Sequence, residues 1–102
     1  MDNGLKATAL LIYNESLEWV LDFVEDELDF QTTIINFENT TSKFYQGTLN
    51  LRDYLDEDIF NILLSIESLF EQRAITLYGS DPRYRLSEKK LRSELEAILA
   101  SA

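Results

Sequence analysis

The 102-residue sequence contains no cysteine and no histidine. Without cysteine the chain can form neither a disulfide nor a thiolate metal site, which excludes a disulfide-stapled secreted scaffold. Without histidine it lacks the commonest general base and the commonest metal ligand, so its serine and threonine hydroxyls have no histidine to activate them. The acidic residues do not follow the spacing of a calcium-binding loop. We therefore expect a protein that is not an enzyme and that uses no cofactor and no metal.

Long apolar runs are also missing. The longest, from Ala7 to Tyr13, has at most seven residues, whereas a membrane-spanning helix needs about 20. The N-terminus does not have the basic start of a signal peptide. These observations predict a cytoplasmic protein that does not contact a membrane.

Basic residues are scarce and unevenly placed. The chain has 9 lysines and arginines against 19 acidic residues, a net charge of −10, and no basic residue occurs from Ala7 to Ser42. Residues 1–72 carry a net charge of −12 and residues 73–102 a net charge of +2. Such a charge distribution repels phosphates and attracts basic proteins. We expect a protein partner with a basic surface and no direct binding to nucleic acid.

The remaining composition is that of a globular protein. Hydrophobic residues make up 45% of the chain and aromatic residues 12%, enough to form a core despite the charge. The length is typical of one domain, and only three glycines and one proline interrupt the chain. We expect residues 1–102 to form a single domain.

Helical periodicity appears in three segments. Apolar residues recur every three or four positions from Leu17 to Leu28, which predicts a helix from Asn14 or Glu15 to Phe30. The preceding residues 7–13 fit either an extension of this helix or a buried strand. The helical period returns after Asp53 and ends at Gly79, although residues 74–78 would also fit a short strand. Ser87 is placed to cap a last helix whose buried face holds four residues: Leu91, Leu95, Ile98 and Leu99.

A β-hairpin is predicted between the first two helices. Residues 31–38 are rich in β-branched side chains, residues 39–42 are a polar turn, and residues 43–51 alternate with a period of two. An antiparallel hairpin needs a covering layer, which the amphipathic helices supply. The expected fold class is therefore a small two-layer α+β domain with the order α-β-β-α-α, or β-α-β-β-α-α if residues 7–13 form a strand.

The stretch from Glu15 to Phe30 concentrates the negative charge. On an ideal helix, six of its carboxylates share an arc of about 100°. These six residues are Glu15, Glu18, Asp22, Glu25, Asp26 and Asp29. Trp19 and Phe23 lie at the edge of this arc, and aromatic residues beside charge are typical of binding surfaces. The competing interpretation is a solvated acidic face whose aromatic residues pack on the hairpin.

Two functions fit these patterns. The first is an acidic inhibitor, immunity or anti-defence protein that imitates nucleic-acid phosphates and occupies the basic surface of a partner. Its partner-binding residues would be the six carboxylates together with Trp19 and Phe23. The basic residues of 83–92 can pair with the protein's own acidic helix, with a second copy, or with an acidic patch on a partner. The alternative function is a structural or regulatory adaptor that forms a homodimer or joins a larger assembly.

Overall fold

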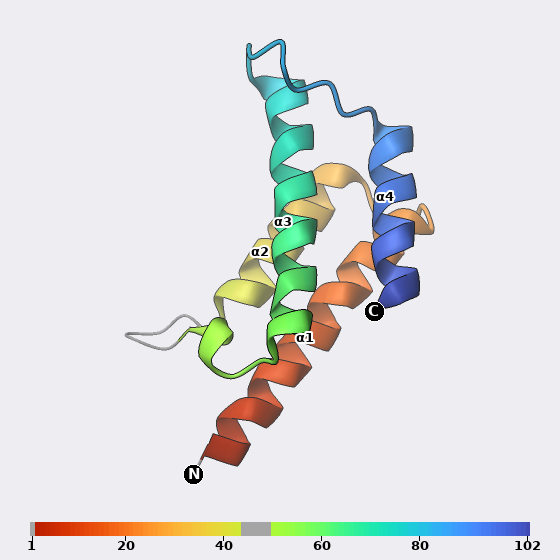
Figure 1. The fold of residues 1–102 in the computed structure, drawn as a ribbon. Helices are drawn as coiled ribbons and strands as arrows, with labels where there is room; N and C mark the ends of the chain where they lie inside the picture. Colours follow the sequence, from red (N-terminus) through yellow and green to blue (C-terminus); the bar gives the residue numbers. More distant parts are fainter. Residues whose placement is uncertain (1, 44–49) are drawn as a thin grey trace.

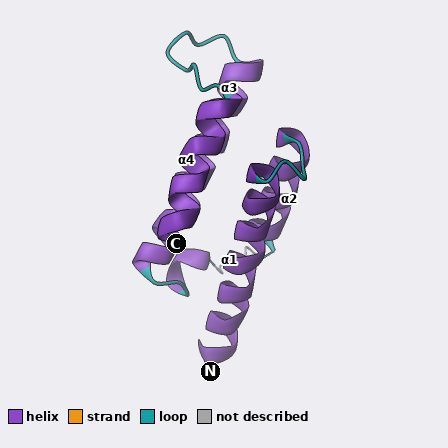
Figure 2. Cartoon of the chain, turned by 90° about the vertical axis from the view of Figure 1, so that its right-hand side faces the viewer, coloured by secondary structure: helices purple, strands orange, loops and turns teal. Residues whose placement is uncertain are grey.

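The computed structural model describes residues 2–43 and 50–102, and this part of the chain forms a bundle of four helices (Figure 1). The helices are α1 (Asp2–Val24), α2 (Phe30–Ser42), α3 (Glu57–Tyr78) and α4 (Glu88–Ser101), with a short 3-10 helix, η1 (Leu51–Asp53), before α3. The described residues contain no strand (Figure 2). The prediction of an α+β domain with a hairpin is therefore wrong in both of its proposed orders.

Successive helices run in opposite directions, and α1 packs against α2 and α4 while α4 also packs against α3 (Figure 1). From the side, α1 and α2 form one layer and α3 and α4 form the other (Figure 2). The first turns of α1 extend past the end of the bundle, and the molecule measures 47 × 26 × 22 Å.

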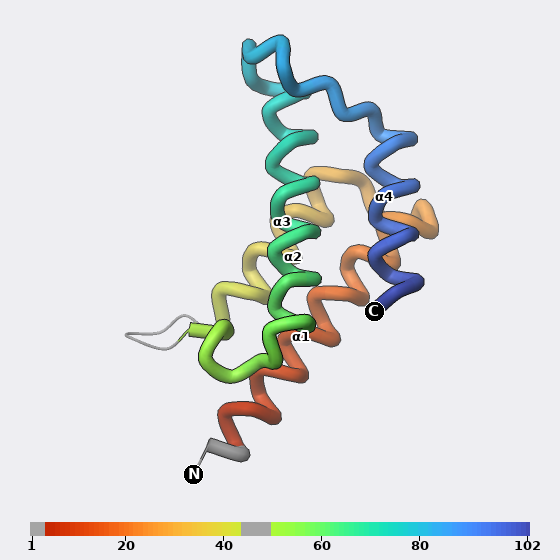
Figure 3. Tube along the Cα trace, viewed as in Figure 1, coloured from red at the N-terminus to blue at the C-terminus, as the bar shows by residue number. Residues whose placement is uncertain are grey.

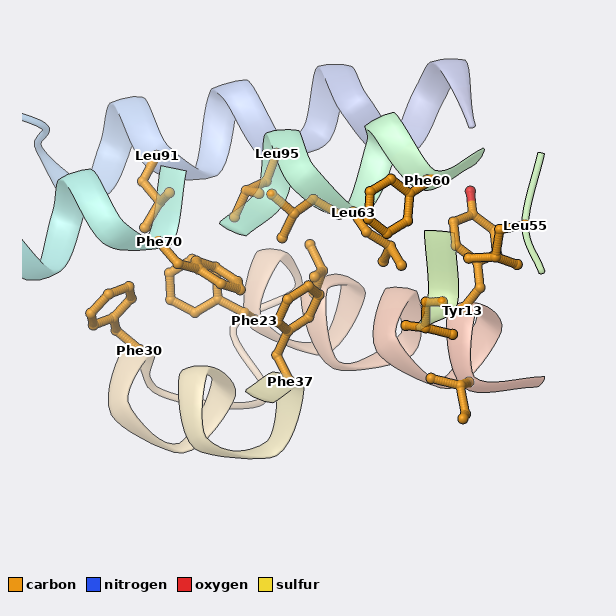
Figure 4. Packing of buried hydrophobic residues seen from close by; sticks show 14 of the residues in the cluster. Tyr13, Phe23, Phe30, Phe37, Leu55, Phe60, Leu63, Phe70, Leu91 and Leu95 are labelled. Atoms are coloured by element: carbon orange, nitrogen blue, oxygen red, sulfur yellow. The ribbon is translucent and has the colours of Figure 1, made fainter. Parts of the chain in front are cut away.

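Aromatic rings fill the space between the two layers (Figure 4). Phe23 of α1 meets Phe30 edge-on at 6.2 Å between ring centroids, and Phe30 and Phe37 of α2 meet Phe70 of α3 at 6.0 and 5.2 Å. Edge-to-face pairs of this kind are each worth about 0.5–1.5 kcal/mol beyond the burial of their area. These rings connect α2 to α3 across the bundle.

The first helix starts earlier and ends earlier than predicted. Residues 7–13 belong to α1, so the helical alternative for this segment is correct, but α1 stops at Val24 rather than Phe30. Asp26 has a φ of 68°, a left-handed conformation that aspartate tolerates better than most residues. The chain then reverses, as the trace in Figure 3 shows, and the Asp29 carboxylate accepts a 2.7 Å hydrogen bond from the Thr32 N–H at the start of α2. An N-cap inside an apparently continuous helical pattern therefore divides it into two helices.

The predicted first strand, residues 31–38, lies within α2. Its β-branched residues have only a slightly lower helix propensity than other side chains, and burial on one face outweighs this preference. The buried residues recur at helical spacing: Phe30, Thr33, Phe37, Thr40 and Thr41. The Thr33 hydroxyl also donates to the Asp29 carbonyl at 2.7 Å, so this buried polar group is satisfied. Most of the predicted second strand, at residues 44–49, lies outside the described part of the chain, and Leu51 is in η1.

The two later helices agree better with the sequence. Helix α3 continues through residues 74–78, which excludes the short strand, and ends just before Gly79. A Cβ atom at Gly79 would lie 2.8 Å from the Ile75 carbonyl oxygen, so this helix end requires glycine. Ser87 caps α4 as predicted, because its hydroxyl accepts a 3.1 Å hydrogen bond from the Lys90 N–H.

The described helices include none with the length and hydrophobicity needed to cross a membrane.

Candidate functional site

The break after Val24 separates the predicted acidic stripe into two groups. Glu15, Glu18 and Asp22 lie on α1, whereas Glu25 and Asp26 lie in the turn that follows it and Asp29 caps α2. Glu27, which the prediction left out, is exposed in the same turn. We call these residues the acidic surface: Glu15, Glu18, Asp22, Glu25, Asp26, Glu27 and Asp29. It is a bent surface over the end of α1 rather than a straight row along one helix.

Three members of the acidic surface have partners within the molecule. Glu15 pairs with Lys43 at 3.2 Å, and Asp26 pairs with Arg92 of α4 at 2.9 Å. The backbone N–H of Thr32 donates a hydrogen bond to the Asp29 carboxylate, and this bond lowers the pKa of Asp29. A hydrogen bond from the Thr32 side chain lowers it further. These three carboxylates therefore contribute to the fold as well as to the surface charge.

The other four carboxylates have no ion pair with any described residue: Glu18, Asp22, Glu25 and Glu27. Glu18, Glu25 and Glu27 are exposed, and Asp22 is half-buried. Their oxygens can accept hydrogen bonds from lysine or arginine side chains of another protein. This is the part of the acidic surface whose charge the bundle leaves uncompensated.

Arg92 belongs to the basic segment 83–92, for which one of the predicted partners is the protein's own acidic helix. Its guanidinium donates hydrogen bonds to the carbonyls of Phe23 and Val24, at the C-terminal end of α1, and lies 4.4 Å from the centre of the Phe23 ring. A cation at this position compensates the negative end of the helix dipole. Arg92 lies 66 residues from its carboxylate partner Asp26 along the chain, and no local pattern relates the two.

The two aromatic residues predicted as anchors do not project freely from this surface. Phe23 has 0% of its surface exposed and belongs to the core, so its assignment as a partner-binding residue is wrong for this fold. Trp19 is half-buried, and its indole N–H donates to the Thr40 hydroxyl of α2 at 2.9 Å. Trp19 therefore connects α1 to α2 and leaves only part of its ring accessible.

Phe23 is buried because the buried face of α1 differs from the predicted one. The predicted face included Leu21, yet Leu21 is 43% exposed, whereas Ser16 is fully buried and donates to the Ile12 carbonyl at 2.7 Å. Within residues 4–24 of α1, the buried side chains are those of Ala9, Ile12, Tyr13, Ser16, Val20 and Phe23. Rotation of the buried face toward Phe23 leaves Leu21, Leu10 and Leu11 on the outside, with Leu11 69% exposed.

Most of the basic residues gather at the end of the bundle where α3 connects to α4. Arg83, Arg85 and Lys90 line a hollow of about 410 Å³ together with Tyr84. Arg83 makes a paired contact with Asp81, which lowers the pKa of the Asp81 carboxyl and raises that of the Arg83 guanidinium. Positive charge therefore gathers near the connection between α3 and α4, whereas the acidic surface lies near the end of α1.

Comparison with known proteins found no matching family model, no similar curated protein and no similar solved structure. Within residues 2–43 and 50–102, no three acidic side chains converge as a metal site would require. The geometry and charge of the surface are therefore the features that indicate a function.

Proposed function

We propose that this protein is an acidic protein-binding module that occupies the basic, nucleic-acid-facing surface of a partner, as an inhibitor, immunity protein or anti-defence protein would. The observation that supports this function is a group of four carboxylates near the end of α1 that have no ion pair within residues 2–43 and 50–102: Glu18, Asp22, Glu25 and Glu27. The composition without cysteine fits action in the cytoplasm, which we propose as its compartment.

Charge mimicry provides the mechanism. A nucleic acid binds a basic groove largely because its phosphates displace counterions and pair with lysines and arginines. Carboxylates that meet the same lysines and arginines compete for them, and the competition weakens as salt screens exposed charges over about 10 Å at 0.1 M. Binding through this surface is therefore expected to be rapid, salt-dependent and exclusive with nucleic acid.

A double charge reversal tests this proposal. Glu18→Lys/Glu25→Lys changes two exposed positions, and lysine near the C-terminal end of α1 favours the helix dipole, so the variant should fold. The matched control, Glu94→Lys/Glu96→Lys, changes the net charge equally at exposed positions of α4. We expect wild type and the control to capture a basic nucleic-acid-binding protein from host lysate, and DNA or RNA to displace it.

The variant of the acidic surface should capture this protein at least about tenfold less well, because two favourable charge contacts become repulsive. Equal capture by the Glu18→Lys/Glu25→Lys variant and by wild type would refute the proposal. Capture that nucleic acid does not displace would refute mimicry.

The exposed leucines of α1 support a second function, an adaptor that self-associates. Leu10, Leu11 and Leu21 lie outside the core, two of them on the early turns of α1. Large apolar side chains left exposed on a helix can contribute to a protein interface. Sedimentation velocity across protein concentration distinguishes the functions, since an adaptor of this kind forms a dimer that Leu11→Lys dissociates, whereas a monomer at all concentrations excludes it.

A further inference from the structure

A groove opens along the outside of the bundle between α2 and α3. The rings of Phe37 and Phe70 meet at its base, where both side chains are buried, and Ile34 and Ala74 continue the apolar floor (Figure 4). The groove has a volume of about 340 Å³. Ile35, 56% exposed, follows Ile34 on α2 and adds apolar area beside the groove.

Acidic side chains line the rest of the groove. Glu38 comes from α2, and Glu67 and Glu71 come from α3, all three exposed and none with an ion pair among the described residues. Burial, and then repulsion from Glu38 and Glu71, raises the pKa of Glu67. Among the described residues that line this groove, none is a lysine or arginine. An apolar floor is thus combined with three uncompensated negative charges.

The two helices that form the groove are held together at one end. The Gln31 side chain of α2 donates a 2.5 Å hydrogen bond to the Tyr78 hydroxyl of α3. The buried contacts of Phe70 with Phe30 and Phe37 also join the two helices beneath the groove. A ligand therefore meets a groove that is already formed, which lowers the entropic cost of binding.

We propose that this groove docks one cationic amphipathic helix of the partner protein. The helix would place apolar side chains on Phe37, Phe70 and Ala74, and lysine or arginine side chains beside the three glutamates. A groove between two antiparallel helices accommodates a third helix by the same packing rules, with contact residues spaced at i, i+3, i+4 and i+7. The inference rests on the proposed function, because that function supplies a basic partner, but it uses a different surface from the end of α1.

Charge complementarity selects this occupant. An anionic helix would bring like charges together at Glu38, Glu67 and Glu71, and burial of a helix without charge would leave those carboxylates partly desolvated and unpaired. Three exposed charge pairs of this kind together account for roughly a tenfold gain in affinity. The apolar contacts with the floor supply the remainder.

Fluorescence polarisation with three synthetic helical peptides tests the proposal on the full chain. The first peptide has leucines at i, i+3, i+4 and i+7 with lysines elsewhere, the second keeps the leucines but replaces lysine by glutamate, and the third keeps the lysines but replaces leucine by serine. We expect the first peptide to bind wild type at least about tenfold more tightly than either of the others. Equal binding of the second peptide, or of the third, would refute the docking model.

Two protein variants locate the binding site. Glu38→Gln/Glu67→Gln/Glu71→Gln should weaken binding of the first peptide by roughly tenfold, and Ala74→Phe should weaken it further by filling the groove, with circular dichroism verifying that the helices persist. The matched control, Glu57→Gln/Glu94→Gln/Glu96→Gln, changes the net charge equally at exposed positions outside both the groove and the acidic surface, and it should bind the first peptide within about threefold of wild type. Unchanged binding by the groove variants would overturn the assignment.

The outcomes of this experiment and of the lysate experiment are separable. A third variant, Glu18→Gln/Glu25→Gln/Glu27→Gln, tests the acidic surface with the same peptide. Peptide binding that this variant weakens and that the groove variants leave unchanged would refute the groove while leaving the acidic surface as the binding site. Failure of the Glu18→Lys/Glu25→Lys variant to change partner capture would refute the proposed function independently of the peptides. Dissociation of a wild-type dimer by the groove variants would show that the occupant is a second copy and would overturn the partner-helix proposal.

Discussion

Arg92 shows how one side chain stabilises a junction that local sequence would leave weak. Helix α1 ends without a basic residue in its last turn, and its terminal carbonyls instead receive hydrogen bonds from the Arg92 guanidinium of α4. The same group pairs with Asp26, whose backbone is in the left-handed region, and lies over the Phe23 ring. A helix end, a turn and a ring in the core therefore depend on one cation.

Substitution of Arg92 tests this dependence. We expect Arg92→Ala to lower the free energy of unfolding by about 2–3 kcal/mol, because it removes charge-assisted hydrogen bonds and a cation–π contact. Urea denaturation followed by circular dichroism measures the loss. Lys89→Ala, at an exposed position of the same helix, is the control and should change stability by less than about 0.5 kcal/mol. Similar losses in the two variants would contradict the role of Arg92.

Glu67 is a residue whose charge opposes folding. Its pKa is raised by burial and then by repulsion from Glu38 and Glu71, so the folded state disfavours its ionised form. Below its ordinary pKa of 4.5 the Glu67 carboxyl is protonated in both the folded and the unfolded state, and it does not destabilise the fold. As the pH rises from there through the higher pKa of the folded state, the carboxyl must ionise in an unfavourable environment and the free energy of unfolding falls. Stability on account of this group is therefore lost with increasing pH.

Glu67→Gln should remove that penalty. At pH 7 we expect the variant to be more stable than wild type by roughly 0.2–0.5 kcal/mol, the cost of a like-charge pair such as Glu67 and Glu71 at i,i+4. The difference should disappear below about pH 4, where the carboxyl is protonated in both states. Urea denaturation at several pH values measures it, and a gain that persists in acid would point to packing instead of charge. Glu96→Gln, on α4, should give no such gain.

At the scale of elements, the sequence predicted the helices that carry clear end signals. Ser87 before α4 and Gly79 after α3 mark those ends by local chemistry, a hydroxyl cap and a position too crowded for a Cβ atom. The segment 31–38 was misassigned because isoleucine and threonine favour strands in isolation, while their spacing around Phe30 and Phe37 favours a helix in the bundle. The Asp29 cap was the local signal that could have separated α1 from α2.

The candidate site was predictable in part for a related reason. The positions of the acidic residues follow directly from the sequence, but the orientation of α1 depends on which side the other helices cover. Burial of Ser16 and Phe23, and exposure of Leu21, follow from contacts with α2 and α4 that are distant in sequence. The groove between α2 and α3 could not be predicted from the sequence either, because its two walls belong to separate helices whose packing depends on distant contacts.

For the whole molecule, net charge sets the response to salt. The formal charge of −10 means that acidic side chains repel one another, and they do so more strongly in the compact folded state than in the unfolded chain. Salt screens this repulsion. We expect the unfolding temperature to rise between about 10 mM and 0.5 M sodium chloride. The Glu18→Lys/Glu25→Lys variant, with a formal charge of −6, should show a smaller rise by differential scanning calorimetry. A decrease with salt would mean that the ion pairs of the bundle outweigh its repulsion.

The contact of α4 with α1 also affects the order in which the fold is completed. During synthesis the N-terminal part of the chain emerges first, yet the carbonyls at the end of α1 meet their donor only after residue 92 has been made. Until then, the nascent chain lacks Leu91 and Leu95, which help to cover the core from α4, and an apolar face stays open to other molecules. The packing of α1 against α4 can therefore form only after nearly the whole chain has been synthesised.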